Sequence, residues 1–140
     1  MLRAAREAVD GLPQRPLLVG VTLLTSHTQR DISAVGLSGD LAERVDALAT
    51  LAHEAGLDGV VCSPHEAARL RQRFGSRFAL ITPGIRLEKV AQDDQARTMS
   101  PRQALAQGAD FLVIGRPVTQ APDPHEVLHT INRQLHEDGR

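Results

Sequence analysis

The sequence predicts an α/β fold in which four parallel strands alternate with helices. Four short apolar runs, each about the length of one strand, are separated by helical patterns; they are residues 17–24, 59–62, 78–82 and 111–114. The flanks of two runs also repeat, since residues 56–63 and 108–115 each place a glycine, an apolar residue and an aspartate before the strand. Near-continuous apolar strands between amphipathic helices indicate a parallel sheet with helices on both faces.

The first elements are a helix, a strand and a second helix. Residues 1–9 have the pattern of an amphipathic helix, and no long apolar segment follows their arginines as it would in a signal peptide. The strand at 17–24 leads into a long connection over residues 26–39. The helix over about 40–55 then carries an apolar stripe at helical spacing, made of Leu41, Val45, Leu48, Leu51, Ala52 and Ala55.

The remaining helices have explicit start and stop signals. Ser63, Ser100 and Asp123 each stand as an N-cap, followed by a proline and, three residues after the cap, by Glu or Gln. The side chains of the cap and of the third residue after it accept hydrogen bonds from backbone N–H groups that have no partner within the first turn. Proline has no backbone N–H and therefore fits at the first helical position. Asp40 starts the preceding helix in the same way, without the proline. Three glycines stand where helices should end: Gly56, Gly75 and Gly108.

These elements form one partial barrel domain over residues 1–140, with a leading helix and four strand–helix units. A (β/α)8 TIM barrel contains eight such units and normally needs about 250 residues, whereas this chain has 140. We therefore expect half of a (β/α)8 TIM barrel.

The composition argues against several classes of partner. A formal net charge of −1 does not favour a nucleic-acid partner, and three Phe without Trp or Tyr leave little for base stacking. No apolar stretch has the length needed to cross a bilayer, so we expect no membrane contact and a cytoplasmic location. The single cysteine, Cys62, lies in an apolar run, where a buried structural thiol is expected.

Two successive strand exits point to a phosphate site. Residues 79–86 and 110–119 are each an apolar run that stops at a glycine and then presents an arginine, Arg86 or Arg116. Ligands of β/α barrels bind where strands end. Glycine lets the backbone approach a ligand, and arginine offers a planar fork of donors that suits phosphate. The connection over 84–99 is long enough to be a lid over a ligand, although its pattern fits a solvated loop nearly as well.

At these residues the chain resembles the orotidine 5'-phosphate decarboxylase family. The resemblance runs from the first helix nearly to the end of the chain, and its strongest segments are residues 21–26, 56–63, 82–86 and 113–120. It implies the C-terminal half of a (β/α)8 barrel, with the N-terminal half absent from this chain. It also implies conversion of orotidine 5'-phosphate to UMP and CO2 without a cofactor, usually by a homodimer.

The resemblance also implies roles for particular residues. Thr25 would line the ligand site at the end of the first strand, and Arg86 and Gln95 would belong to the loop that closes over the nucleotide. Gly115 and Arg116 would bind the 5'-phosphate, in agreement with the strand exits. The expected partner is therefore a small nucleotide, orotidine 5'-phosphate or UMP.

The chain departs from the family at the catalytic centre. The family signature D-x-K-x-x-D does not occur, and the only lysine, Lys89, lies in the long connection. Arginine cannot replace lysine as the proton donor because its pKa is above about 12. We therefore expect no catalytic residue in this chain and no activity of the chain alone. The alternative is a non-catalytic phosphate- or nucleotide-binding protein, or a half-barrel that complements a second half.

One competing motif is H-E-x-x-H at residues 125–129, the pattern of zinc metalloproteases. The spacing places both imidazoles on one face of a helix. His125 lies in the first helical turn, however, and His136 is one residue beyond the position of the third ligand in the extended motif. Two solvated histidines are the favoured interpretation, and no metal is expected.

Overall fold

The computed structural model describes residues 1–87 and 98–136. Its centre is a sheet of four parallel strands in the order β1-β2-β3-β4. The strands are β1 (Val19–Val21), β2 (Gly59–Val61), β3 (Ala79–Thr82) and β4 (Phe111–Leu112). The predicted α/β class with four parallel strands is confirmed, while each strand is shorter than its apolar run because only these residues pair with a neighbour.

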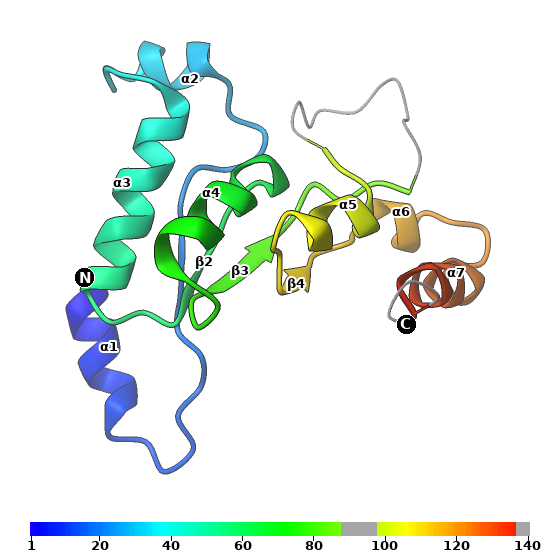
Figure 1. The fold of residues 1–140 in the computed structure, drawn as a ribbon, viewed down its shortest axis with the longest axis horizontal. Coiled ribbons are helices and arrows are strands. Elements are labelled where there is room, and N and C mark those ends of the chain that lie inside the picture. The colour runs from blue at the N-terminus through cyan, green and yellow to red at the C-terminus, as the bar shows by residue number, and fades with distance from the viewer. Residues whose placement is uncertain (88–97, 137–140) are drawn as a thin grey trace.

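The helices alternate with the strands as expected, with two additions. The five predicted helices are α1 (Leu2–Asp10), α3 (Leu41–Glu54), α4 (Pro64–Phe74), α5 (Pro101–Ala106) and α7 (Pro124–His136). Two short helices, α2 (Gln29–Ala34) and α6 (Arg116–Thr119), lie inside segments predicted as connections. Figure 1 shows α3, α4 and α5 following the sheet in the order of its strands.

The predicted start signals act as helix caps. The side chains of Asp40, Ser63 and Ser100 each accept a backbone hydrogen bond from the first turn, and the side chain of residue N3 accepts one from the backbone N–H of the cap. Asp123 accepts from the N–H groups of residues 125 and 126 at 3.0 Å each. The unpredicted helix α2 has the same reciprocal arrangement between Thr28 and Asp31.

One face of the sheet forms the core. Gly20, Val60 and Leu80 are aligned across β1, β2 and β3, and Val60 and Leu80 pack against buried residues of α3 and α4. A Cβ added to Gly20 would lie 3.2 Å from Leu57 and 3.4 Å from Ala52, so helix packing leaves no room there. A second cluster, formed around Ile85 and Ala104, continues this layer beneath α5.

The opposite face carries apolar side chains that remain accessible. Val21, Val61, Ile81 and Phe111 are aligned across all four strands. Val61 and Ile81 are half-buried, whereas Val21 is 59% and Phe111 52% exposed. The expectation of helices over both faces therefore does not hold for the described residues.

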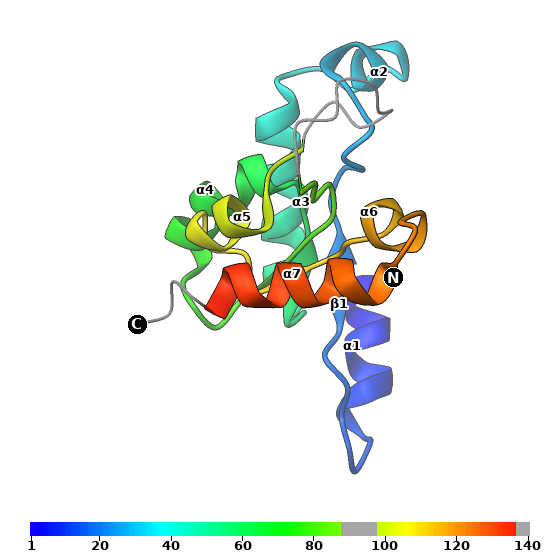
Figure 2. The ribbon, with the colours of Figure 1, turned by 90° about the vertical axis from the view of Figure 1, so that its right-hand side faces the viewer.

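The two ends of the sheet face different helices. In both views α1 and α2 lie at opposite ends of the molecule (Figures 1 and 2). The amino ends of β2 and β4 follow the repeated aspartates, Asp58 and Asp110. Each carboxylate accepts a hydrogen bond from a backbone N–H of a neighbouring strand segment, Leu18 at 2.7 Å and Leu80 at 2.8 Å respectively.

Arginines far away in the sequence complete both arrangements. Arg6 of α1 and Arg15 bind the Asp58 carboxylate at 3.2 and 2.6 Å. Arg71 of α4 binds Asp110 and also donates to the carbonyl oxygens of residues 75, 78 and 108, at 2.6–3.2 Å. In both copies of the sequence motif, the aspartate therefore links one or more distant arginines to the backbone at the amino ends of the strands. We call these two arrangements the Asp58 clasp and the Asp110 clasp.

Candidate functional site at the carboxyl ends of the strands

A cavity of about 260 Å³ lies where the first three strands end. Its walls come from the segment after β1, from the end of β2 and from the residue after β3. The lining residues are Val21, Leu23, Leu24, Thr25, Ser26, Val61, Cys62 and Pro83. Parallel β/α sheets bind their ligands at this edge, so the cavity is the candidate site.

Thr25 is the predicted site residue that lines this cavity. Its side chain is buried, four residues beyond the end of β1. Sequence reasoning did not connect Cys62 with the site. The prediction that Cys62 is a buried free thiol is confirmed; the residue belongs to the hydrophobic core and is also one of those that line the cavity.

Arg86 lies at the start of the long connection after β3, and the backbone fixes its position. Ile85 and Met99 form a parallel bridge outside the main sheet. The N–H of Arg86 donates to Met99 at 3.0 Å, and the N–H of Met99 donates to Gly84 at 3.1 Å. The half-buried Arg86 side chain donates to the carbonyl of Ile85 at 3.0 Å. The bridge therefore joins the two described ends of the connection.

Gly115 and Arg116 follow β4 at the adjacent strand exit. Gly115 precedes α6, and Arg116 is the first residue of that helix. Both are exposed. Gly115 has an ordinary negative φ of −100°, and a Cβ added there would meet nothing within 4 Å. Packing does not require glycine at this position, so the absence of a side chain leaves the backbone accessible.

The predicted residues gather at one edge of the sheet without converging on one cavity. Arg86 and Arg116 follow neighbouring strands, because β3 pairs with β4 through Thr82 and Leu112. Thr25 follows β1, three strand spacings of about 4.8 Å away from β4. Neither Arg86 nor Arg116 is among the residues that line the cavity. Gln95 and Lys89 lie outside the described residues.

The cavity is chemically sparse. Among the described residues, its lining offers the hydroxyls of Thr25 and Ser26 and contains no carboxylate, lysine or histidine. Both hydroxyls can donate or accept hydrogen bonds to a polar ligand. The described lining therefore supplies hydrogen-bonding groups but no carboxylate, amine or imidazole that could act as a general acid.

Two aspartates with shifted pKa values, Asp58 and Asp31, do not belong to the lining of this cavity. Burial raises the pKa of Asp58, but the hydrogen bond from Leu18 and the neighbouring Arg15 and Arg6 outweigh burial, so the pKa is lowered overall. Asp31 of α2 also has a lowered pKa, first because the backbone N–H of Thr28 donates to it and then because the Thr28 hydroxyl does. Both aspartates stabilise local structure, and only Asp58 belongs to the sheet.

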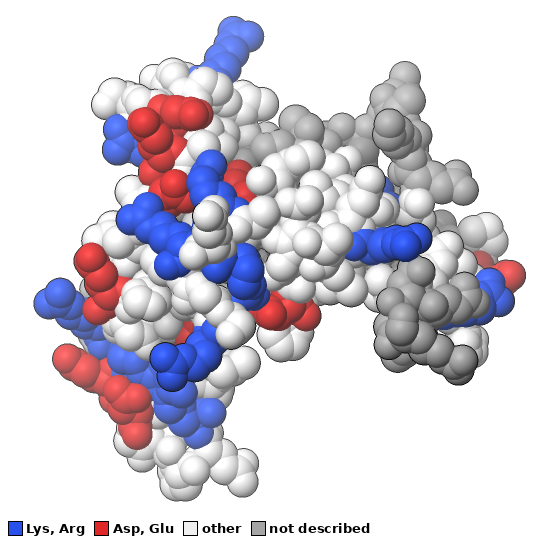
Figure 3. Space-filling model, viewed as in Figure 1, with Lys and Arg blue, Asp and Glu red and all other residues white. Residues whose placement is uncertain are grey.

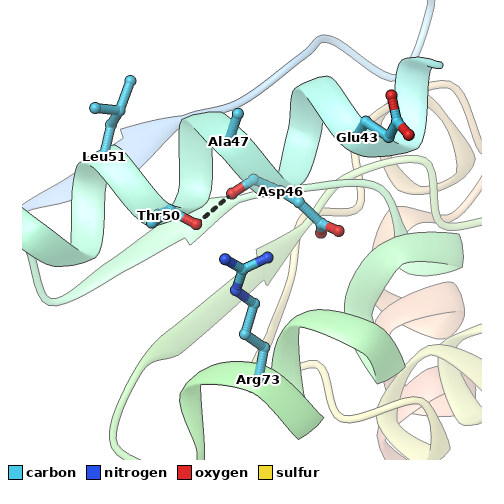
Figure 4. A pocket seen from close by; sticks show the side chains of 6 residues that line it. All are labelled: Glu43, Asp46, Ala47, Thr50, Leu51 and Arg73. Atoms are coloured by element: carbon cyan, nitrogen blue, oxygen red, sulfur yellow. Dashed lines mark hydrogen bonds between the residues drawn. The ribbon is translucent and has the colours of Figure 1, made fainter. Parts of the chain in front are cut away.

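The outer surface between α3 and α4 contains a second, open hollow of about 540 Å³. Figure 4 shows Arg73 of α4 extending toward α3, where Glu43, Asp46 and Leu51 also line the hollow. Charged side chains of both signs spread over the part of the face that carries α1 and α3 (Figure 3). This mixture is typical of a solvated helical surface.

The H-E-x-x-H segment is helical, as its spacing predicted. The rings of His125 and His129 have centroids 4.9 Å apart, and both residues are exposed. Among residues 1–87 and 98–136, no group of three or more His, Cys, Asp or Glu side chains could hold a metal ion. Within the same residues, no helix is long and apolar enough to span a membrane.

Together, the parallel sheet, the outer helices and the cavity at the strand ends define a protein of the β/α-barrel type. The family model described as "Orotidine 5'-phosphate decarboxylase / HUMPS family" matches residues 1–131. The chain belongs to this family.

Curated relatives agree with this assignment. Orotidine 5'-phosphate decarboxylase of Legionella pneumophila (strain Paris) is 52% identical over 136 residues, which cover 96% of this chain and 59% of the relative. The Chromobacterium violaceum enzyme is 53% identical over 135 residues, which cover 96% of this chain and 55% of the relative. The chain thus spans somewhat more than half the length of the curated relatives it matches.

Solved structures show the same partial coverage. The crystal structure of orotidine 5'-phosphate decarboxylase from Lactobacillus acidophilus matches with a TM-score of 0.79 at 33% identity, over 96% of this chain and 58% of that chain. An uncharacterized conserved protein from Geobacillus kaustophilus matches with a TM-score of 0.76 at 37% identity, over 96% and 57%. The predicted partial barrel is therefore confirmed as the fold of this chain.

Proposed function

We propose that this chain forms the phosphate-binding part of an orotidine 5'-phosphate decarboxylase site. The family reaction releases CO2 from orotidine 5'-phosphate and yields UMP. The observation that carries the proposal is the family match over residues 1–131, combined with two adjacent strand exits that each present an arginine. The enzyme would act in pyrimidine biosynthesis, in the cytoplasm and as a homodimer, without a cofactor.

In this proposal each strand exit has a separate task. Gly115 leaves its backbone open to the 5'-phosphate, and Arg116 supplies a fixed positive charge with several donors. Arg86, whose backbone is held by the bridge to Met99, approaches the nucleotide from the neighbouring exit together with Gln95. Thr25 contacts the ligand from the cavity at the end of β1.

The catalytic centre is proposed to lie outside this chain. The reaction needs a proton donor at the carbon that loses CO2, and the family uses a lysine beside aspartates. The cavity lining contains neither, and the single lysine stands in the connection after β3. The purified chain should therefore bind UMP and show no detectable decarboxylation.

Two measurements on the purified 15.1 kDa chain test this proposal. Calorimetric titration with UMP should give binding that is lost in Arg116→Ala and competed by inorganic phosphate. Arg133→Ala on the exposed surface of α7 is the control and should bind UMP like the original chain. UMP binding that survives Arg116→Ala would overturn the phosphate assignment. Decarboxylation clearly above that of the Arg116→Ala sample would overturn the missing catalytic centre.

The accessible face of the sheet favours a second candidate from another class, a non-catalytic nucleotide-binding or complementing half-barrel. The two candidates predict different decarboxylation activities once the rest of a family barrel is supplied. Decarboxylation that appears on complementation supports the enzyme. UMP binding without decarboxylation, even in a completed barrel, supports the non-catalytic protein.

A further inference from the structure

His125 and His129 lie on the solvent side of α7, outside the residues assigned to the nucleotide. The inward stripe of this helix passes through Val127, Ile131 and Leu135, of which Ile131 is 3% exposed. At about 100° per residue, the two histidines lie about 140° around the helix from that stripe, and both are exposed. The packing of α7 against α5 and α6 therefore uses another face of the helix.

The separation of the two imidazole rings is the one that a shared metal ion requires. An imidazole nitrogen binds Zn²⁺ at about 2.0–2.1 Å, which places the ring centroid roughly 3.2 Å from the ion. Two such rings, at an angle of about 90–110° across the ion, have centroids about 4.5–5.2 Å apart. The centroids of His125 and His129 are 4.9 Å apart, with the ring planes inclined at 60°. Both rings can therefore bind one ion without a change in the helix backbone.

Neighbouring carboxylates favour a cation at this end of α7. The positive end of the helix dipole disfavours a cation here, but Asp123 accepts the N–H groups of His125 and Glu126 at 3.0 Å each. Asp123 and Glu126 also bring two negative charges to the first turn. The basic residue of this helix, Arg133, stands a full turn beyond His129. The local charge therefore attracts a divalent cation more than it repels one.

The pair is too small for the centre of a zinc protease. Structural zinc sites use four protein ligands and catalytic sites use three. Among residues 1–87 and 98–136, no group of three or more His, Cys, Asp or Glu side chains could hold a metal ion. An ion bound by two imidazoles alone keeps water at its remaining positions, so it would be held weakly and would exchange with solution.

We propose that His125 and His129 form an exchangeable surface site for a divalent transition-metal ion, Zn²⁺, Ni²⁺ or Cu²⁺. Each imidazole supplies one nitrogen ligand. Imidazole suits these ions, whereas Mg²⁺ and Ca²⁺ prefer oxygen ligands, and Cu²⁺ should bind more tightly than the other two. The motif alone favours two solvated histidines, and the ring separation changes that interpretation. The site is independent of the proposed function and takes no part in decarboxylation.

Helix α4 supplies a matched control within the same chain. Both α4 and α7 begin with a cap residue followed by Pro-His-Glu, so His65 has the same place in α4 as His125 has in α7. His65 is exposed as well. Four residues further on, α4 has Arg69 where α7 has His129. His65 therefore lacks the second imidazole that the proposed site needs.

Calorimetric titration with NiSO4 tests the site on the full chain, produced without a polyhistidine tag. His125→Ala and His129→Ala should each weaken Ni²⁺ binding about tenfold or more, because the second imidazole of a chelating pair binds at high effective concentration. His65→Ala should bind Ni²⁺ like the unsubstituted chain. Unchanged affinity in either α7 variant, or an equal loss in His65→Ala, would overturn the site.

NMR of the histidine rings locates the ion without a substitution, and so covers the case in which a variant does not fold. On titration with ZnCl2, the ring signals of His125 and His129 should shift together and saturate at the same Zn²⁺ concentration, while those of His65 stay unchanged. MgCl2 at equal concentration should shift neither ring of the pair. Zn²⁺ shifts that saturate separately, or that occur only at other histidines, would overturn the proposal. UMP binding is measured in its own titration, so its failure would leave this result unaffected.

Discussion

The amino and carboxyl ends of the same sheet are built in opposite ways. At the amino ends, Asp58 and Asp110 each accept a backbone N–H and an arginine, so polar groups satisfy one another. At the carboxyl ends, an apolar cavity, an accessible glycine and two arginines leave room for another molecule. Stabilising polar contacts therefore lie at the amino ends, while the carboxyl ends, where β/α barrels generally bind their ligands, stay accessible.

The largest loss of stability should follow from replacing Arg71, which acts at the amino end of the sheet. Replacing it by Met removes the cation paired with Asp110 and the donors to three backbone carbonyls. The free energy of unfolding should fall by about 3 kcal/mol, because several backbone hydrogen bonds are lost together with the ion pair, measured by urea denaturation. Arg69→Met on the same helix breaks a similarly exposed pair with Asp46 and only one hydrogen bond to a backbone carbonyl, and should cost about 1 kcal/mol or less. Equal losses in both variants would contradict the Asp110 clasp.

Gly59→Ala should have the next largest effect. A Cβ at this first residue of β2 would collide with the backbone carbonyl and side chain of Ala79 on β3. Because backbone cannot move aside cheaply, we expect a loss of about 2 kcal/mol in unfolding free energy. A thermal melt unchanged from that of the original chain would show that the two strands can separate slightly at this end.

Acid sensitivity tests the Asp58 clasp. The pKa of Asp58 is lowered in the folded state. The ionised carboxylate therefore contributes fully to the free energy of unfolding above its unfolded-state pKa of about 3.9, and this contribution is lost as the pH falls through the folded-state pKa. Asp58→Asn should lower the free energy of unfolding at pH 7 by about 1–2 kcal/mol. The difference between variant and original chain should shrink when melts are repeated below about pH 4.

Asp31→Asn is the comparison for this pH experiment. Its lowered pKa arises from hydrogen bonds within the start of α2, outside the sheet. Global melts of this variant should follow those of the original chain at each pH. A parallel loss in both variants would mean that the acid response is not specific to the sheet.

The smallest effect on stability should come from Gly115→Ala at the carboxyl end. Because a Cβ at Gly115 would meet nothing within 4 Å, we expect a change within about 0.5 kcal/mol. Under the proposed function, the methyl group would instead obstruct the phosphate and weaken UMP binding about tenfold. Calorimetry and denaturation on the same sample separate the two effects, and a variant that loses stability but still binds UMP would reverse the comparison.

Local signals predicted most of the fold. The caps at Ser63 and Ser100 and the terminating Gly75 lie within single turns, so the sequence alone specifies where these helices begin and end. Helix α2 was missed because its cap uses Asp31 in place of Glu or Gln. The strand predicted over residues 17–24 is longer than β1, because the apolar run extends beyond the residues that pair with β2.

The candidate site was only partly predictable, because its position depends on contacts distant in sequence. Adjacent strand exits identified Arg86 and Arg116, since strand order follows chain order in this sheet. The motif repeat containing Asp58 and Asp110 was visible, but its partners Arg6 and Arg71 lie 52 and 39 residues away. Cys62 was predicted as buried, and only the folded cavity shows which neighbours it has.

The bridge between Ile85 and Met99 bears on how the connection after β3 tolerates a change in length. Since the backbone already joins the ends of the connection, we expect residues gained or lost between them to leave the strand pairing unchanged. Lengthening a closed loop costs only about 0.6 kcal/mol for each doubling. The segment between these two residues is therefore a natural insertion point, where a peptide tag or a sensor domain could be spliced in without disturbing the strands.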